Sequence, residues 1–127
     1  MTFLKRILLV DPEPRLTTAV RAALEGTGKY LIKEEHDTRS AVNAARWFQP
    51  NLILFELFSA APQASLIAQK IQQDAACQDT PVLFFKADDA SERVVSGGIL
   101  SGYSFFANPV PLEEFVGCIA ELLSPAS

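Results

Sequence analysis

A short apolar run, Leu52 to Phe55, constrains the fold of this chain more than any other segment. Pro50 and Asn51 introduce the run, and Glu56 ends it. Because four apolar residues are too few for a helix and leave no polar face, the pattern predicts a strand that is covered on both sides, as in a parallel sheet. The carboxylate of Glu56 would then lie at the C-terminal edge of the sheet, where open α/β folds bind their ligands.

Strand-like and helix-like segments alternate along the chain. We expect strands at 7–10, 30–33, 52–56, 81–85 and 104–107, and helices at 16–24, 40–48, around 66–71, at 91–100 and after Pro111. Gly97 and Gly98 weaken the fourth of these helices. Five β-α units without an internal repeat predict one α/β domain with a doubly wound parallel sheet and helices on both faces. We assign it to residues 1–123, and 124–127 to a tail or linker.

Composition narrows the class of partner. The chain has 127 residues, 49% of them hydrophobic, and no apolar stretch is long enough to span a membrane. Its net charge of -4 argues against direct binding of nucleic acid, which requires clustered lysine and arginine. Cys77 and Cys118 lack metal-ligand or redox spacing, and the N-terminus does not resemble a signal peptide. We therefore expect a protein of the reducing cytoplasm.

Four segments, taken in order, resemble the receiver domain of bacterial two-component response regulators, a CheY-like member of the flavodoxin-like fold. They are ILLVDPEP at 7–14, PNLILFEL at 50–57, PVLFFKA at 81–87 and FFANP at 105–109. The resemblance covers nearly the whole chain. It implies a five-stranded parallel sheet in the order 2-1-3-4-5 with five helices, and it places Glu56 at the phosphoacceptor position.

By the same resemblance, the acidic part of the phosphate pocket is degenerate. Receivers hold magnesium with two adjacent acidic residues after the first strand, and here these positions are Asp11 and Pro12. The phosphoacceptor is normally an aspartate, and the extra methylene of Glu56 moves the carboxylate and disturbs in-line geometry. Asp11, Glu13 and Glu56 could form only a loose acidic cluster, and magnesium requires an octahedral shell of oxygens. We expect no functional metal site, with Asp11 and Glu56 as weak candidates, and no cofactor.

The remaining pocket positions are altered as well. The resemblance places Lys86 where a hydroxyl residue normally binds the phosphoryl group, and Phe105 where an aromatic residue acts as a switch. Asn108 replaces the lysine that precedes the retained Pro109, and the peptide bond between them is expected to be cis. Neither Lys86 nor Phe105 carries a hydroxyl that could report phosphate.

Two interpretations of Lys86 remain open. Its ammonium group could reach Glu56 and Asp11 as a permanent ion pair, or it could extend from the strand end into water. His36, beside Glu35 and Asp37, is interpreted as a solvated loop residue rather than a catalytic base. Trp47 and Phe48 are expected to anchor the second helix to the sheet.

These features favour a pseudo-receiver, a non-enzymatic module that binds another signalling protein, or a second copy of itself, without being switched by phosphate. The alternatives are residual metal-dependent phosphoacceptor chemistry on Glu56 or Asp11, and a sensor that binds a small ligand at the C-terminal crevice of the sheet. Apolar residues too numerous to face the core predict an interaction face, which comprises Val94, Val95, Ile99, Leu100, Phe105, Phe115, Cys118 and Leu122.

Overall fold

The computed structural model describes residues 4–11, 17–56, 73, 79–88, 93–100, 103–106 and 110–124. Its strands are β1 (Lys5–Val10), β2 (Tyr30–Glu35), β3 (Leu52–Glu56), β4 (Val82–Asp88), β5 (Arg93–Leu100), β6 (Tyr103–Phe106) and β7 (Val110–Pro111). Its helices are α1 (Thr18–Gly26), α2 (Thr38–Phe48) and α4 (Leu112–Leu123). The helix expected around 66–71 lies outside the described residues.

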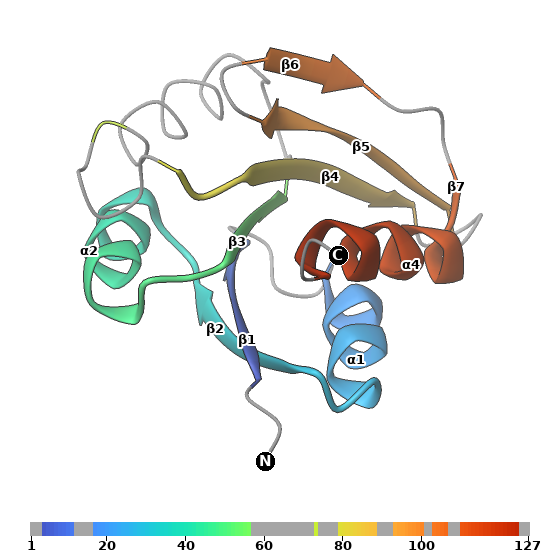
Figure 1. The fold of residues 1–127 in the computed structure, drawn as a ribbon, viewed down its shortest axis with the longest axis horizontal. Helices are drawn as coiled ribbons and strands as arrows, with labels where there is room; N and C mark the ends of the chain where they lie inside the picture. The colour runs from blue at the N-terminus through green and yellow to red at the C-terminus, as the bar shows by residue number, and fades with distance from the viewer. Residues whose placement is uncertain are drawn as a thin grey trace.

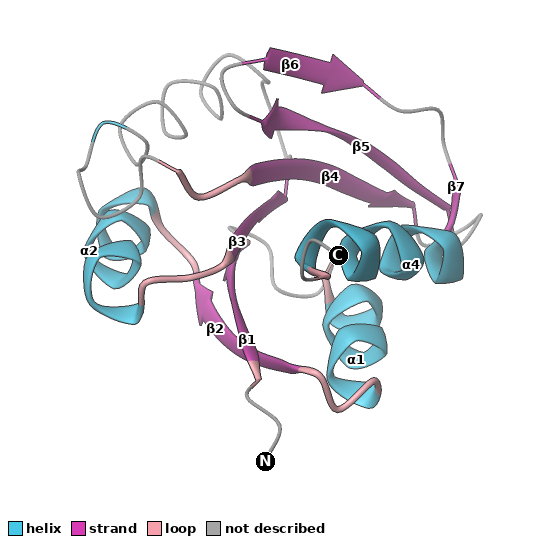
Figure 2. Cartoon of the chain, in the orientation of Figure 1, coloured by secondary structure: helices cyan, strands magenta, loops and turns pink. Residues whose placement is uncertain are grey.

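One sheet runs through the molecule in the order β2-β1-β3-β4-β5-β6, and β7 pairs with β5. The four strands from β2 to β4 are parallel. Figures 1 and 2 show α2 on one side of this sheet and α1 with α4 on the other. This arrangement confirms the predicted α/β class and the flavodoxin-like parallel order of the first four strands.

β3 lies at the centre because its side chains can be buried on both faces of the sheet. All five of its residues are buried, from Leu52 to Glu56. Alternate residues contribute to two apolar clusters, since successive side chains of a strand point to opposite faces. The first cluster, with α2, contains Ile53 and Phe55. The second, with α1 and α4, contains Leu52 and Leu54.

Local sequence signals set the ends of the helices. Asp37 caps α2 by accepting a hydrogen bond from the backbone N–H of Ser40 at 2.9 Å. Gln49 then ends α2 in the left-handed conformation (φ 50°), before Pro50. After α1, Gly28 adopts a positive φ of 69° that a residue with a side chain rarely takes, and the chain turns into β2.

The segment 93–100 differs from its prediction, because it forms strand β5 and not a helix. β5 pairs antiparallel with β4, in a register that includes Phe84 with Gly97 and Lys86 with Val95. The two glycines lower helix propensity, and the β-branched residues Val94, Val95 and Ile99 favour a strand. The strand expected at 104–107 is present as β6, but it pairs with β5, also antiparallel. The prediction of a wholly parallel sheet is therefore wrong beyond β4, where β5 pairs antiparallel with β4, β6 and β7.

The two aromatic residues at the end of α2 have different environments. Phe48 packs against the first apolar cluster, as predicted. Trp47 is 65% exposed, so the prediction that it anchors α2 to the sheet is wrong. Its ring lies instead beneath the ammonium group of Lys33 in β2, 5.8 Å from the ring centroid. In the part of the chain that the structure describes, no helix is long and apolar enough to cross a membrane.

Candidate functional site

Strand register brings the acidic residues of the chain to one edge of the sheet. Val10 is paired with Phe55 on one side and with Glu35 on the other. The residues that follow these three are Asp11, Glu56 and His36, so Asp11 occupies the middle position at the C-terminal edge. Its backbone N–H donates to the carbonyl of Glu35 at 2.9 Å, which holds the end of β1 against β2.

Asp11, Glu34 and Glu56 share one face of the sheet. Leu9 and Leu54 belong to the cluster under α1 and α4, and Asp11 and Glu56 come two residues after them. Glu34 is the register partner of Leu9. Because side chains alternate along a strand and partners share a face, these carboxylates lie on the α1 side. Asp11 and Glu34 are contacted from this side by Thr17, just before α1, and by Arg21 of α1.

Asp11 is completely buried, yet both of its carboxylate oxygens have partners. Thr17, just before α1, donates its hydroxyl hydrogen to Oδ2 at 2.5 Å. Nδ1 of His36 lies 2.9 Å from Oδ1 and 3.2 Å from the backbone carbonyl oxygen of Asp11. Since both of these oxygens are acceptors, Nδ1 carries a proton. The imidazole thus fixes the end of β1 to the residue that follows β2.

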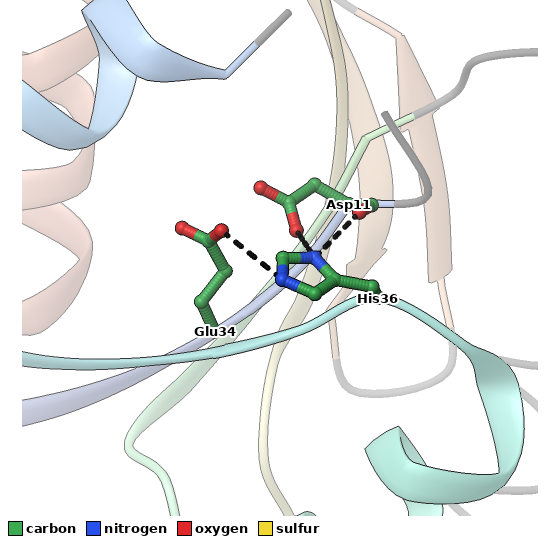
Figure 3. A group of neighbouring side chains, drawn as sticks. All are labelled: Asp11, Glu34 and His36. Atoms are coloured by element: carbon green, nitrogen blue, oxygen red, sulfur yellow. Dashed lines mark hydrogen bonds and ion pairs between the residues drawn. The ribbon is translucent and has the colours of Figure 1, made fainter. Parts of the chain in front are cut away.

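Glu34 extends this network away from Asp11, as Figure 3 shows. Its Oε2 lies 3.7 Å from Nε2 of His36. Its Oε1 accepts a hydrogen bond from Nη1 of Arg21 at 2.5 Å. Arg21 also pairs with Glu25, one turn further along α1, at 2.7 Å. The imidazole is therefore held between two carboxylates, each of which has its second oxygen bound by a residue at or near α1.

Burial and hydrogen bonding shift the pKa values of this network. The pKa of Asp11 is raised, mainly because burial disfavours the charged carboxylate, and the hydrogen bond from Thr17 partly offsets this effect. The pKa of His36 is also raised, first by the backbone carbonyl of Asp11 and then by its carboxylate. His36 is thus biased towards the imidazolium form, in which both ring nitrogens donate towards oxygen atoms.

Glu56 and Lys86 lie in contrasting surroundings. Glu56 is 1% exposed, whereas Lys86 is exposed. Phe85 is the register partner of Glu56 and shares its face of the sheet, so Lys86, the next residue of β4, projects to the other face. Of the two interpretations of Lys86, this placement favours the solvated side chain over the ion pair with Glu56.

Other residues predicted for the pocket are only partly described. Pro12 and Glu13 lie outside the described residues, as do Asn108, Pro109 and the cis peptide bond expected between them. Phe105 is part of β6, and the description there covers the backbone alone. The predicted role of these positions stays a prediction.

The predicted interaction face needs correction at two positions. Val94 and Phe115 are each 1% exposed and belong to the second apolar cluster, so they cannot contribute to an exposed surface. On α4, Cys118 is exposed, and Leu122 is partly buried against the same cluster. For Val95, Ile99, Leu100 and Phe105, the description covers the backbone only. Phe115 was placed on the exposed face because only one stripe of α4 was expected to face the core. The side of α4 that packs on the second apolar cluster is wider than that stripe and includes Phe115.

Sequence reasoning missed His36 and Glu34 as members of the site. The second strand was expected to end at Lys33, but β2 continues to Glu35 and carries both residues to the sheet edge. His36 is exposed, as a loop residue would be, but its ring contacts Asp11. The strand order contained a usable signal. In a sheet in which the first and second strands are neighbours, the residues that follow them lie side by side.

Asp11, Glu34 and His36 form a group with ligand atoms for a metal ion. One ligand atom from each residue lies within 4.8 Å of the other two. Asp11 was predicted as a weak metal candidate together with Glu56. Among the described residues, however, the group that contains Asp11 is completed by Glu34 of β2 and by His36, which follows β2. The arrangement offers carboxylate oxygens and an imidazole nitrogen at an edge that is open to water through His36.

Comparisons with known proteins point to one group of regulators. No family model matches the chain. Over 123 residues it is 26% identical to Response regulator Rre1 of Synechocystis sp., and over 122 residues it is 28% identical to Transcriptional regulatory protein TrcR of Mycobacterium tuberculosis. These alignments cover 93% and 96% of this chain but 51% and 46% of the relatives. The chain therefore spans about half the length of the curated relatives that it matches.

Solved structures agree in fold. The receiver domain of NtrC4 from Aquifex aeolicus superposes with a TM-score of 0.64 at 19% identity, and the match covers 94% of this chain and 96% of that domain. A variant of HypX from the same organism gives a TM-score of 0.57 at 16% identity, over 95% of this chain and 26% of that protein. Taken with the parallel core, these matches show that the chain has the flavodoxin-like fold of a receiver domain, and its sequence is similar to part of two response regulators.

Proposed function

We propose that this domain is a cytoplasmic, non-enzymatic pseudo-receiver, which binds another signalling protein and is not switched by phosphorylation. The observation that carries the proposal is the engagement of Asp11 by Thr17 and His36. A receiver needs its retained acidic residue to bind magnesium. Here an incoming magnesium ion would have to compete with the hydrogen bonds that Thr17 and His36 make to the two oxygens of a buried carboxylate.

The residue at the phosphoacceptor position supports the same conclusion. Glu56 is almost completely buried at the end of β3. A glutamate carboxylate lies one methylene further from the backbone than that of an aspartate, so attack on a phosphodonor would begin from a displaced position. Misplacement of this size lowers the rates of reactions that depend on alignment, by about 100-fold for a shift of 1 Å. Phosphoryl transfer to Glu56 is therefore disfavoured both by the displaced carboxylate and by the weakened binding of magnesium.

The proposed contact surface is the outer face near α4. Its described members are Cys118, which is exposed, and Leu122, which is half-buried. Leu100 and Phe105 stay in the proposal through their position in β5 and β6. Val95 and Ile99 are left out, because they are the register partners of Lys86 and Val82, on the face of the sheet away from α4. Charged substitutions at Cys118 and Leu122 are expected to abolish self-association or partner capture while unfolding stays cooperative. Unchanged binding by both variants would exclude this face.

Beryllofluoride binding tests the phosphate part of the proposal. We expect no change in the amide NMR spectrum when beryllofluoride and millimolar magnesium are added, because the groups that would hold the mimic are altered or engaged. Saturable shifts that disappear in Glu56→Gln would instead favour a residual phosphoacceptor. Shifts caused by nucleotides or flavins at the same sheet edge would favour the ligand-sensor alternative.

A further inference from the structure

We propose that Asp11, Glu34 and His36 form a binding site for a divalent transition metal ion of the zinc type. The proposal goes beyond the proposed function and does not depend on it, since no phosphate chemistry is involved. The ends of β1 and β2 supply the site, because their register pairs Leu9 with Glu34 and Val10 with Glu35. Asp11 and His36, the residues that follow this last pair, therefore lie side by side. Figure 3 shows both carboxylates directed at the same imidazole.

Each carboxylate already has a partner that fixes its orientation. Thr17 holds Oδ2 of Asp11, and Arg21 holds Oε1 of Glu34, both at 2.5 Å. The other oxygen of each carboxylate faces a nitrogen of His36, at 2.9 Å for Asp11 and 3.7 Å for Glu34. Groups that orient metal ligands in this way raise affinity because the ligands need little rearrangement. The two carboxylates are therefore held in place before an ion arrives.

The distances allow an ion to enter with small movements. Bonds of about 2.0–2.2 Å to a tetrahedral zinc ion place neighbouring ligand atoms about 3.4 Å apart. Here the three ligand atoms lie within 4.8 Å of one another. Side-chain rotation of His36, which is 55% exposed, can supply the adjustment, whereas Asp11 is fully buried and fixed. The exposed imidazole also leaves an entry path and room for a water ligand.

The chemistry of the ligands selects the class of ion. One imidazole nitrogen with two carboxylate oxygens suits zinc, cobalt(II) or nickel(II), whereas magnesium prefers oxygen ligands only. Two carboxylates and a neutral imidazole also balance the charge of a divalent ion. The ring coordinates in its neutral form, so the ion replaces a proton of the imidazolium, which is released to solvent. His36, whose hydrogen bond to Asp11 competes with magnesium, thus becomes a ligand for a softer ion.

A cobalt(II) titration of the untagged full chain tests this site. We expect a visible absorption band that saturates at one ion per chain and disappears when zinc is added, but not when millimolar magnesium is added. Cys77 and Cys118 are both replaced by serine in the titrated protein, because a thiolate would also bind cobalt. Loss of the band in His36→Ala, with an unchanged far-UV circular dichroism spectrum, would assign the imidazole as a ligand.

Neighbouring glutamates provide a matched control. Glu34→Gln removes a ligand and is expected to weaken cobalt binding by at least about tenfold. Glu35→Gln removes the same charge one residue away, on the opposite face of β2, and is expected to change the affinity by less than about twofold. Equal weakening by the two variants, a band that survives His36→Ala, or no saturable binding would each overturn the site. Beryllofluoride results bear only on the proposed function, so failures of the two proposals are distinguishable.

Discussion

A single histidine connects the ends of two strands in this domain. His36 contacts both the backbone carbonyl and the carboxylate of Asp11, although the two residues are 25 positions apart in sequence. The resemblance to receiver domains implies that a residue at the position of Asp11 helps to hold magnesium. Here its carboxylate is hydrogen-bonded to Thr17 and His36 of the same chain. The replacement of one kind of partner by another is the main chemical difference at the residue scale.

Thr17 makes the hydrogen bond to Asp11 whose loss is simplest to measure. Thr17→Val keeps the shape of the side chain but removes the hydroxyl donor, so the buried Oδ2 loses its partner. We expect the free energy of unfolding to fall by about 1–3 kcal/mol in urea denaturation. Thr17→Ser retains a hydroxyl and should keep most of that stability. Equal losses in the two variants would show that the methyl group, not the hydrogen bond, carries the effect.

His36 is the only histidine of the chain, so its titration can be followed without assignment. We expect the midpoint of its ring signal in NMR to lie above the ordinary pKa of about 6.5, with a chelator present, and Asp11→Asn to lower it. Because the pKa of His36 is raised on folding, the stabilisation by its imidazolium is complete below about pH 6.5 and is lost as pH rises through the folded pKa. A midpoint at or below 6.5 would contradict the contact with Asp11.

At the scale of elements, α4 shows how far an apolar stripe determines burial. Phe115 and Cys118 are about one turn apart. From the sequence, both were placed on an exposed interaction face, because α4 has more apolar residues than one core-facing stripe needs. Phe115 packs on Phe85 of β4, with ring centroids 5.6 Å apart, whereas Cys118 is exposed. The orientation of α4 against the sheet decides between them. Helical spacing alone does not give that orientation.

This difference within α4 predicts two unlike substitutions. Phe115→Ala should lower the free energy of unfolding by about 3–5 kcal/mol, because it leaves a cavity between α4 and β4. Cys118→Ala removes a side chain of little buried area and should change that free energy by no more than about 0.5 kcal/mol. Thermal or urea unfolding of both variants measures the contrast. A small effect of Phe115→Ala would return this residue to the exposed interaction face.

At the scale of the whole molecule, the parallel core was predictable, and the segment after β4 was not. The runs at 7–10, 52–55 and 82–85 are short, apolar and followed by a charged residue, which fits buried parallel strands. At 93–100 the pattern was ambiguous, because Val94, Val95 and Ile99 suit a helix face and a strand almost equally. Pairing with β4 decides the matter, and such a contact between distant segments is not visible in local spacing.

Sequence reasoning predicted Asp11 and Glu56 as residues of the candidate site but missed Glu34 and His36. Asp11 and Glu56 were found because each ends an apolar run, which places it at the C-terminal edge of a parallel sheet. Glu34 and His36 were missed because KEEH at 33–36 has the polarity of a loop, although β2 continues to Glu35. An edge strand needs only one buried face, so its sequence is less apolar than that of β3. Register between the first two strands is the information that local sequence lacked.

Intact-mass spectrometry after incubation with acetyl phosphate and magnesium tests whether this domain accepts phosphate. We predict no added phosphoryl mass on the parent chain, because Asp11 is engaged by Thr17 and His36 and the position of the acceptor carboxylate is displaced at Glu56. The Glu56→Gln variant serves as the matched control and should give the same spectrum as the parent. Stoichiometric addition of one phosphoryl group to the parent, absent from Glu56→Gln, would contradict the account.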